Sequence, residues 1–419
     1  MPAPPLGRKP VPQGGVGGYS PVMQVAVIGA GPAGLMAAET LAQGGAQVTI
    51  FERMPNPARK FLLAGRGGLN LTHSEPLSAF LGRYGAAAAA LAPSIEAFPP
   101  TALIAWAEGL GQPCFTGTSG RVFPRALKAS PLLRAWLGRL AGLGVTLRAR
   151  HHWQGWDAEG ALRFATPAGE VTQRPAATLL ALGGASWPRL GADGGWVSLL
   201  PGVVPLRPAN CGFRIAWSAH LRERFAGTPL KRIALTFGSQ VVRGEAVLTE
   251  GGLEGGAVYA LAAPLRDAIA LGGPQQLSLD LRPDLSATQL ATRLDGPRGA
   301  QSLGNVLRRA GFAPLGVALV QEALRAGAPG PLSALVRALP LTVTAPEGLA
   351  RAISTAGGVG WDAVDAGLAL CARPDVFLAG EMLDWEAPTG GYLLQACLAT
   401  GRSAARAMLT QAGPDRPGE

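Results

Sequence analysis

One glycine motif constrains the fold of this chain more than any other feature. Residues 29–34, Gly-Ala-Gly-Pro-Ala-Gly, stand between two short apolar runs, and the second run ends on Glu52. Gly29 permits a tight turn out of a strand, Gly31 lets the backbone approach a pyrophosphate, and Gly34 lets the next helix press against the sheet. The phosphates then face the positive N-terminus of that helix. The motif therefore predicts a strand, turn and helix that bind a dinucleotide, with Glu52 accepting hydrogen bonds from a ribose diol.

The surroundings of the motif separate it from a chance match in a chain with 59 glycines. Val25–Ile28 and Val48–Phe51 are typical of short buried strands, and small residues such as Ala37 and Ala38 follow the motif. Glu52 also lies at about the 20-residue distance expected of a ribose-binding acid. These features together favour the nucleotide site over an ordinary glycine-rich turn.

Composition indicates a globular enzyme of two or three domains. The chain has 419 residues, of which 48% are hydrophobic and 15% charged. No apolar stretch reaches the roughly 20 residues needed to span a bilayer, so we expect no membrane span. Residues 1–22 are rich in Pro and Gly and lack the continuous apolar segment of a secretory signal. We therefore expect a flexible leader and a cytoplasmic protein.

Cysteine and histidine usage argues against a metal site. The four cysteines form no CxxC pair, which also disfavours a dithiol centre or a disulfide framework. His151 and His152 are adjacent and would point to opposite faces of a strand. We therefore predict no bound metal and interpret the cysteines as small buried hydrophobic residues.

The formal net charge of +10 raises the question of a nucleic-acid partner. Only four of the 37 basic residues are lysines, and the arginine excess runs through the whole chain. The densest basic cluster, Arg222–Arg232, has no interleaved aromatic residues apart from Phe225. We interpret the charge as a coding preference and expect a small-molecule substrate rather than RNA or DNA.

The chain up to about residue 202 has the pattern of an α/β nucleotide-binding domain. A basic, glycine-rich loop occupies residues 56–72. The continuous apolar run 178–182 indicates a central parallel strand buried on both faces, and it ends in Gly183 and Gly184, at the sheet edge where such folds bind ligands. The remaining patterns predict helices at 77–84, 101–110 and 131–143, a strand at 144–149, and a hairpin formed by 161–165 and 170–173.

From about residue 203 the pattern changes to antiparallel strands followed by helices, which predicts an inserted domain. The expected strands are 211–217, 232–237 and 240–248, and the expected helices are 261–270, 287–294, 304–310, 317–325 and 332–339. At 341–344 the pattern becomes strand-like again, and we expect the chain to return there to the first domain.

A second strong signal lies near the C-terminus. The buried strand 376–379 delivers Glu381 and Asp384 to the sheet edge, and Gly390 and Gly391 then open a long helix. The positive end of that helix could stabilise negative charge on a reduced ring, such as N1 and O2 of a flavin. The alternative is a strand, loop and helix packed only for stability.

These motifs together resemble the BaiN/YhiN-type FAD-dependent oxidoreductases. The resemblance rests on the glycine motif, the loop 60–72, Gly120–Pro124 with Lys128 and Ala129, Leu248–Leu253, and the block Ala379–Tyr392, and it covers nearly the whole chain beyond residue 22. It implies an α/β fold: a Rossmann-like FAD-binding domain of the two-dinucleotide-binding flavoprotein type, with an inserted β-rich plus helical domain. The expected divisions are 1–22 leader, 23–202 FAD-binding domain (first part), 203–340 inserted domain, 341–410 FAD-binding domain (second part) and 411–419 flexible tail.

The resemblance also implies roles for individual residues. The three motif glycines would contact the pyrophosphate, Glu52 the adenosine ribose and Glu381 the ribityl chain. Arg59, Lys60 and the loop from Gly67 to Thr72, called the ring loop below, would lie along the diphosphate and ring. Backbone donors at 390–392 would serve the pyrimidine end of the flavin. The predicted cofactor contacts are Gly29, Gly31, Pro32, Ala33, Gly34, Glu52, Arg53, Arg59, Lys60, Gly67, Gly68, Asn70, Leu71, Thr72, Gly183, Gly184, Gly380, Glu381, Asp384, Gly390, Gly391 and Tyr392.

One departure from the family pattern concerns the ring loop. Many members have Gly-Arg-Cys-Asn where this chain has Gly67-Gly68-Leu69-Asn70. A thiol or guanidinium near the flavin is therefore not expected here, because Leu69 can only pack.

The expected activity is an FAD-dependent oxidoreductase in which NAD(P)H reduces the flavin and the flavin reduces an organic acceptor. No second GxGxxG unit marks a nicotinamide site. An RNA-modifying flavoprotein and a non-catalytic FAD-binding regulator are the alternatives. The catalytic group is not identified, and the candidates are His73, Asp384 and Tyr392; His73 could instead cap the next helix, and Asp384 could be a ribityl ligand or a turn former.

Overall fold

The structure is a computed structural model that describes residues 22–412. The predicted leader, apart from Val22, and the predicted tail, apart from residues 411 and 412, lie outside the described residues.

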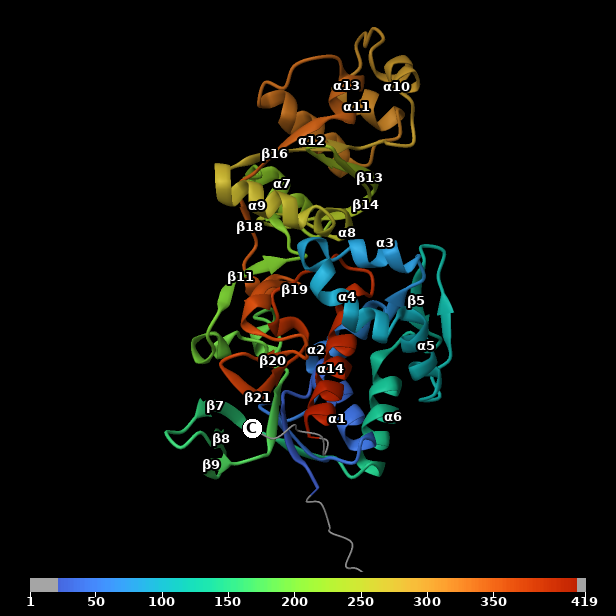
Figure 1. Ribbon diagram of the computed structural model, residues 1–419. Helices are drawn as coiled ribbons and strands as arrows, with labels where there is room; N and C mark the ends of the chain where they lie inside the picture. Colours follow the sequence, from blue (N-terminus) through green and yellow to red (C-terminus); the bar gives the residue numbers. More distant parts are fainter. Residues whose placement is uncertain (1–21, 413–419) are drawn as a thin grey trace, which may run out of the picture.

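A six-stranded sheet forms the centre of the first domain (Figure 1). Its strands, in spatial order, are β20 (Ala369–Leu370), β21 (Arg373–Leu378), β10 (Ala177–Leu180), β1 (Gln24–Ile28), β2 (Gln47–Glu52) and β6 (Thr146–Ala149). All neighbours are parallel except β20, which is antiparallel to β21. Every residue of β10 is buried, as the apolar run predicted for a central strand.

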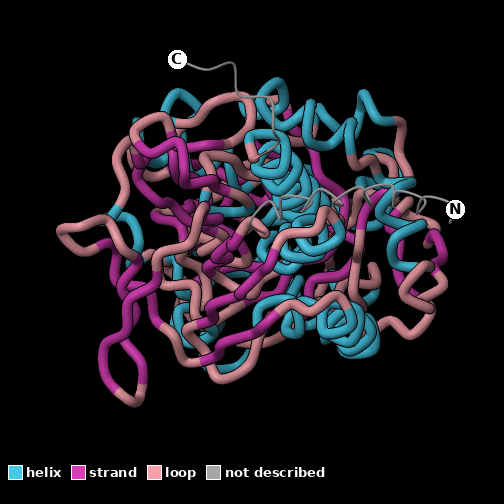
Figure 2. The backbone as a smooth tube through the Cα atoms, turned by 60° about the horizontal axis from the view of Figure 1, so that its bottom comes forward, coloured by secondary structure: helices cyan, strands magenta, loops and turns pink. Residues whose placement is uncertain are grey.

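Helices cover one face of this sheet, and an antiparallel sheet covers the other. Helices α1 (Pro32–Gln43) and α14 (Tyr392–Gln411) pack side by side, so closely that a Cβ on Gly401 would lie 2.3 Å from the Ala33 carbonyl oxygen. On the opposite face, Phe51 of β2 stacks on Phe164 with ring centroids 4.3 Å apart. Phe164 belongs to the sheet of β7 (His152–Trp156), β8 (Leu162–Thr166) and β9 (Gly169–Gln173), which projects from the body (Figures 1 and 2).

Further elements of this domain surround α1 and α14. The helices are α2 (Arg59–Ala64), α3 (Leu77–Gly82), α4 (Ala88–Ala97), α5 (Pro100–Glu108) and α6 (Ala129–Gly142), and the small sheet consists of β3 (Thr72–His73), β5 (Arg121–Pro124) and β4 (Cys114–Thr116). Buried Glu39 of α1 joins that helix to α5 and α6, because its carboxylate accepts from Trp106 Nε1 at 3.1 Å, Trp136 Nε1 at 2.7 Å and Arg139 Nη1 at 2.9 Å.

The inserted domain contains a seven-stranded sheet that is antiparallel throughout. Its spatial order is β17 (Leu339–Val343), β16 (Gln275–Asp280), β13 (Pro229–Phe237), β14 (Gln240–Leu248), β15 (Gly252–Glu254), β12 (Phe213–Arg214) and β18 (Ala345–Pro346). Its helices are α7 (Ala219–Phe225), α8 (Gly256–Tyr259), α9 (Ala262–Gly272), α10 (Ala287–Leu294), α11 (Leu303–Arg309), α12 (Pro314–Arg325) and α13 (Leu332–Arg337).

Local sequence explains where several of these helices begin. The side chains of Ser218, Ser286 and Ser302 accept hydrogen bonds from the first turns of α7, α10 and α11. Ser286 and Gln289 complete a reciprocal capping box. Pro314 occupies the first turn of α12, where its missing N–H is not needed.

The return to the first domain comes later in the chain than the strand pattern at 341–344 indicated. That strand is β17, and it pairs with β16 at the far edge of the seven-stranded sheet instead of joining the parallel sheet. The strand β12 is also shorter than the predicted 211–217. Two separate hydrophobic cores follow this division: the core of the inserted domain runs from Cys211 to Ala352, and the core of the first domain comprises residues on either side of it.

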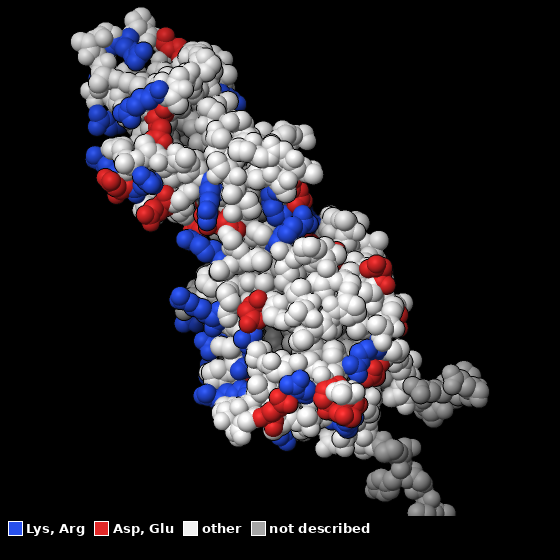
Figure 3. Space-filling model, turned by 90° about the vertical axis from the view of Figure 1, so that its left-hand side faces the viewer, with Lys and Arg blue, Asp and Glu red and all other residues white. Residues whose placement is uncertain are grey.

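Two paired strands connect the domains. β11 (Val203–Ala209) leads into the inserted domain and β19 (Ser354–Val359) leads out, and they pair antiparallel, with Ala209 opposite Ser354. Figure 3 shows the resulting two lobes, with acidic and basic side chains intermixed on the face in view.

Within residues 22–412, no single helix is long and apolar enough to cross a membrane. One pair of adjacent helical segments, 85–97 and 100–108, has together the length and composition of a membrane span, with a bend of 41° between the two segments.

Candidate nucleotide and flavin site

A cavity of about 350 Å³ opens at the carboxyl ends of the central parallel strands. β1, β2, β10 and β21 all end at it, which is where open α/β sheets bind ligands. The predicted site residues that line it are Gly29, Gly31, Pro32, Ala33, Glu52, Arg53, Arg59, Lys60, Gly183, Gly380 and Glu381.

The three glycines of the motif differ in what a side chain at each position would contact. Gly29 has a φ of +102°, and a Cβ there would lie 2.3 Å from the Ala181 carbonyl oxygen. A Cβ on Gly34 would lie 2.0 Å from the Gly29 oxygen, so Gly34 permits close helix packing without itself lining the cavity. Gly31, in contrast, has nothing within 4 Å of its Cβ position. Its open side faces the cavity at the N-terminus of α1, where free N–H groups favour an anion.

The side chain of Glu52 is hydrogen-bonded to the same turn. Its Oε2 accepts the Ala30 N–H at 2.9 Å and its Oε1 accepts the Met54 N–H at 2.8 Å. Burial raises the pKa of this carboxyl, against the lowering effect of the two backbone hydrogen bonds and of Arg53 and Arg59. A carboxylate has about four acceptor positions, so Glu52 retains capacity for a ribose hydroxyl.

A charged network forms the opposite wall of the cavity. Lys60 Nζ donates to Glu381 Oε2 at 2.7 Å and to Ser186 Oγ at 2.5 Å, and Glu381 Oε1 accepts the Thr355 N–H at 3.1 Å. Lys60 comes from α2, Ser186 from the segment after β10, Thr355 from β19 and Glu381 from the turn after β21, so the network joins four distant segments of the chain. Burial and the neighbouring Glu381 raise the pKa of the lining thiol Cys397 to about 12, so it stays protonated at neutral pH.

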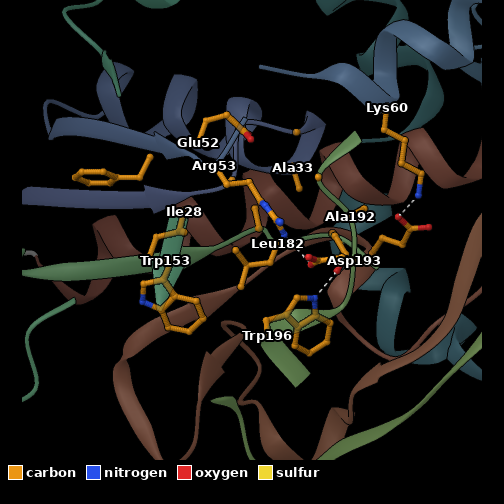
Figure 4. A pocket seen from close by; sticks show the side chains of 18 of the residues that line it. Ile28, Ala33, Glu52, Arg53, Lys60, Trp153, Leu182, Ala192, Asp193 and Trp196 are labelled. Carbon is orange, nitrogen blue, oxygen red and sulfur yellow. Dashed lines mark hydrogen bonds and ion pairs between the residues drawn. The ribbon is translucent and has the colours of Figure 1, made fainter. Parts of the chain in front are cut away.

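Sequence reasoning missed the outer wall of the cavity. Arg53 Nη1 contacts Asp193 at 2.7 Å, and Trp196 Nε1 donates to the Gly183 oxygen at 2.9 Å (Figure 4). Trp153 lies nearby, and its buried Nε1 has no hydrogen-bond partner among the described residues. The lining residues outside the predicted set are Ile28, Phe51, Asn56, Ala58, Phe61, His151, His152, Trp153, Gln154, Ala181, Leu182, Leu190, Gly191, Ala192, Asp193, Gly195, Trp196, Ser198, Leu199, Ala379 and Cys397.

The remaining predicted residues do not line this cavity. They are Gly34, Gly67, Gly68, Asn70, Leu71, Thr72, Gly184, Asp384, Gly390, Gly391 and Tyr392. Several meet at a second place: a Cβ on Gly391 would lie 2.5 Å from the Thr72 Cα, so the start of α14 abuts the end of the ring loop. Asn70 is the unsatisfied member of that loop, since its buried Oδ1 has no partner among the described residues. Leu69 is buried, as predicted for a residue that only packs.

Two of the three catalytic candidates have their polar atoms engaged within the protein. The Glu75 N–H donates to His73 Nδ1 at 3.1 Å, which leaves the proton on Nε2 for the Ser119 oxygen at 2.9 Å. The Tyr392 hydroxyl donates to Glu75 Oε1 at 2.6 Å, and burial raises the pKa of Tyr392. Burial also raises the pKa of Asp384, which Arg207 lowers and Glu386 raises further.

The residues present fit a flavin dinucleotide. The open face of Gly31 at a helix N-terminus suits a diphosphate, and the buried acceptor of Glu52 suits a ribose. The orphaned oxygen of Asn70 suits an N–H donor from a bound ring.

Comparison with known proteins decides the family. A sequence model described as the HI0933-like protein Rossmann domain matches residues 23–407. The chain belongs to this family. The family includes the BaiN/YhiN-type flavoproteins, so the resemblance drawn from the motifs is confirmed, and the chain is an FAD-binding oxidoreductase of the Rossmann type. No curated protein is significantly similar to the chain.

The chain is similar to several solved structures. The chain is similar to 3-ketosteroid Δ1-dehydrogenase from Sterolibacterium denitrificans, with a TM-score of 0.52 and 12% identity over 92% of this chain and 99% of that one. It is also similar to the open conformation of a flavocytochrome c3 fumarate reductase, with a TM-score of 0.49 and 15% identity over 94% of this chain and 79% of that one. At such identities the likeness to the dehydrogenase shows the fold alone, and it confirms the predicted Rossmann-type FAD-binding fold with additional antiparallel sheets.

Proposed function

We propose that this FAD-dependent oxidoreductase takes electrons from NADH or NADPH and passes them to a small organic acceptor. The observation that carries the proposal is the cavity at the sheet edge, with the open N-terminus of α1 at Gly31 on one side and the Lys60–Glu381 pair on the other. When bound, FAD supplies reversible two-electron chemistry, and the protein supplies orientation and electrostatics.

The described residues have separable roles in holding the cofactor. Gly31 and the first turn of α1 receive the diphosphate, while Glu52 receives the adenosine ribose. Lys60 keeps Glu381 in place, because its ammonium ion is shared between that carboxylate and Ser186. The ring loop, with Asn70, and the start of α14 at Gly391 receive the ring. The acceptor then binds between this region and the inserted domain.

The experiment is an anaerobic reduction of the purified yellow protein. We expect NADH or NADPH to bleach the visible flavin absorbance in a saturable way, and the reduced protein to be reoxidised by members of a panel of enones and quinones. Dithionite serves as the control for complete reduction. Failure of both nicotinamides, with complete reduction by dithionite, would disprove the nicotinamide part and leave FAD binding intact.

The overall positive charge keeps an RNA substrate as the competing proposal. Counterion release makes such binding strongly dependent on salt. An RNA affinity that falls steeply between low and high salt would favour that alternative over a small-molecule acceptor, whereas flavin that no donor reduces would favour a regulatory role.

A further inference from the structure

The contact between the two domains contains one buried arginine. Arg266, on α9 of the inserted domain, is 3% exposed, and no other arginine or lysine is buried among the residues whose side-chain exposure the structure describes. A buried charge is costly unless it is paired and fully hydrogen-bonded. The surroundings of Arg266 therefore have to satisfy it.

Every N–H of the Arg266 guanidinium has an acceptor. Nε and Nη2 donate to the two oxygens of Asp267, at 2.9 and 3.2 Å. Nη1 and Nη2 donate to the two oxygens of Glu386, at 2.9 and 2.7 Å, and Nη1 also donates to the Pro208 oxygen at 3.1 Å. A guanidinium has five N–H donors in a fixed plane. This network therefore fixes the orientation of the Arg266 guanidinium as well as its distance from the acceptors.

The three acceptors belong to three different parts of the molecule. Asp267 lies on the same helix as Arg266, Pro208 lies on the incoming strand β11, and Glu386 lies in the segment 384–391 of the FAD-binding domain. The pair with Glu386 thus crosses from one domain to the other.

A second residue at the junction holds the same segment independently. Asn210 has a φ of 49°, which an asparagine tolerates better than most residues. Its buried Nδ2 donates to the Ala387 oxygen at 2.8 Å and to Ser354 Oγ at 2.7 Å. The segment 384–391 is therefore tied to both crossing strands and to the inserted domain.

This segment connects two parts of the proposed cofactor site. Its first residue follows shortly after Glu381, which lines the cavity. Its last residue is Gly391, which immediately precedes α14 and abuts Thr72 of the ring loop. Only a few residues separate Glu386 from Glu381 on one side and from Gly391 on the other, so a displacement of Glu386 affects both parts of the cofactor site.

We propose that Arg266 is a positioning residue that couples the placement of the inserted domain to the segment 384–391 and, through it, to the start of α14. The part concerning the flavin rests on the proposed function. The coupling itself is a property of the chain and is measurable without FAD.

The first test is hydrogen exchange of the protein without FAD. We expect Arg266→Ala to speed amide exchange in residues 384–391 about tenfold, with β13 and β14 of the inserted domain unchanged. Arg163→Ala is the control, because it removes an exposed ion pair with Glu170, at 3.0 Å, in the sheet of β7, β8 and β9. Unchanged exchange in 384–391 would overturn the coupling whether or not the protein binds FAD.

The second test uses the holoprotein. We expect Arg266→Ala to raise the dissociation constant of FAD about tenfold, and to shift the visible flavin band and the midpoint potential. Arg266→Lys should restore the FAD affinity, the flavin band and the potential only in part, since lysine keeps the positive charge but lacks the planar guanidinium that binds both oxygens of a carboxylate. The same substitutions should leave the unfolding of each domain cooperative, which separates positioning from loss of fold.

A double-mutant cycle decides between positioning and general damage. Glu386→Ala should reproduce the effects of Arg266→Ala, and the double variant should add nothing further. If the two effects add, or if the flavin spectrum, potential and FAD affinity all remain those of the wild type, the proposal is wrong. Should Arg266→Ala fail to fold, Glu386→Gln and Arg266→Lys provide the same comparison with smaller changes.

Discussion

At the scale of single residues, the glycine motif separates folding from binding. Gly34 and Gly31 lie three positions apart, yet a Cβ at Gly34 meets a backbone oxygen and a Cβ at Gly31 meets open space. The same substitution at these two positions therefore affects different properties.

We expect Gly34→Ala to lower the free energy of unfolding by about 3 kcal/mol, because α1 must move away from the Gly29 oxygen. Gly31→Ala should leave the stability of the FAD-free protein unchanged or slightly raised, but should weaken FAD binding because its methyl group points into the diphosphate position. Urea unfolding and FAD titration of both variants measure the two effects. Equal loss of stability in the two variants would contradict this division.

The buried carboxyl of Glu52 makes the stability of the folded protein depend on pH. Burial raises its pKa above the ordinary value of 4.5, so the folded protein binds the proton more tightly than the unfolded chain. Stability therefore increases as the pH falls through the interval from the folded pKa down to 4.5.

The comparison with Glu52→Gln isolates that contribution. As the pH is lowered from neutral to about 4.5, thermal melts of FAD-free protein should show the wild type gaining stability relative to the variant. A difference between the two proteins that does not change with pH would show that Glu52 has the same pKa in both states.

The residue scale also shows where sequence reasoning succeeds. The motif glycines and Glu52 were identifiable because a turn between adjacent strands is encoded locally. Asp193 and Trp196 were not, because they lie in an irregular segment without periodicity, and tertiary contacts with Arg53 and Gly183 bring that segment to the cavity. The nearby glycines at 191, 194 and 195 were the available signal.

At the scale of elements, helix contacts depend on a few polar or small residues. Glu39 lies inside α1, yet it binds donors from α5 and α6 that are far away in the sequence. A helical periodicity predicts that such a position is buried but does not reveal the three partners.

Glu39→Ala should be strongly destabilising, by about 3 kcal/mol or more, because it leaves two indole N–H groups and Arg139 Nη1 without their acceptor. The matched control is Glu170→Ala, which breaks the exposed pair with Arg163 at 3.0 Å and should lower the free energy of unfolding far less, because solvent screens an exposed ion pair. Urea denaturation measures both. Similar losses in the two variants would show that burial of the Glu39 network adds no stability.

Strand order shows the same limit of local patterns. The run 341–344 is a strand as predicted, but its partner is β16 of the inserted domain. Periodicity specifies which residues face a core, whereas the choice between two sheets depends on pairing across long sequence separations.

At the scale of the whole molecule, the two hydrophobic cores predict two unfolding transitions. FAD contacts only the first domain in the proposed site, so ligand binding should stabilise that domain directly, by about 2.7 kcal/mol at a free concentration one hundred times the dissociation constant. In calorimetry with increasing FAD, one transition should move to higher temperature and the other should move much less. A single transition that shifts as a unit would mean that the junction at Arg266 makes the domains one cooperative body.

The pairing of β11 with β19 has a further consequence. Because Ala209 stands opposite Ser354, the chain leaves and rejoins the flavin-binding scaffold at neighbouring points. One recombination event between the corresponding codons would remove or exchange the intervening module and leave a continuous scaffold. If the acceptor binds against the inserted domain, as proposed, this architecture lets acceptor specificity evolve by replacing a module, while the redox machinery is inherited intact.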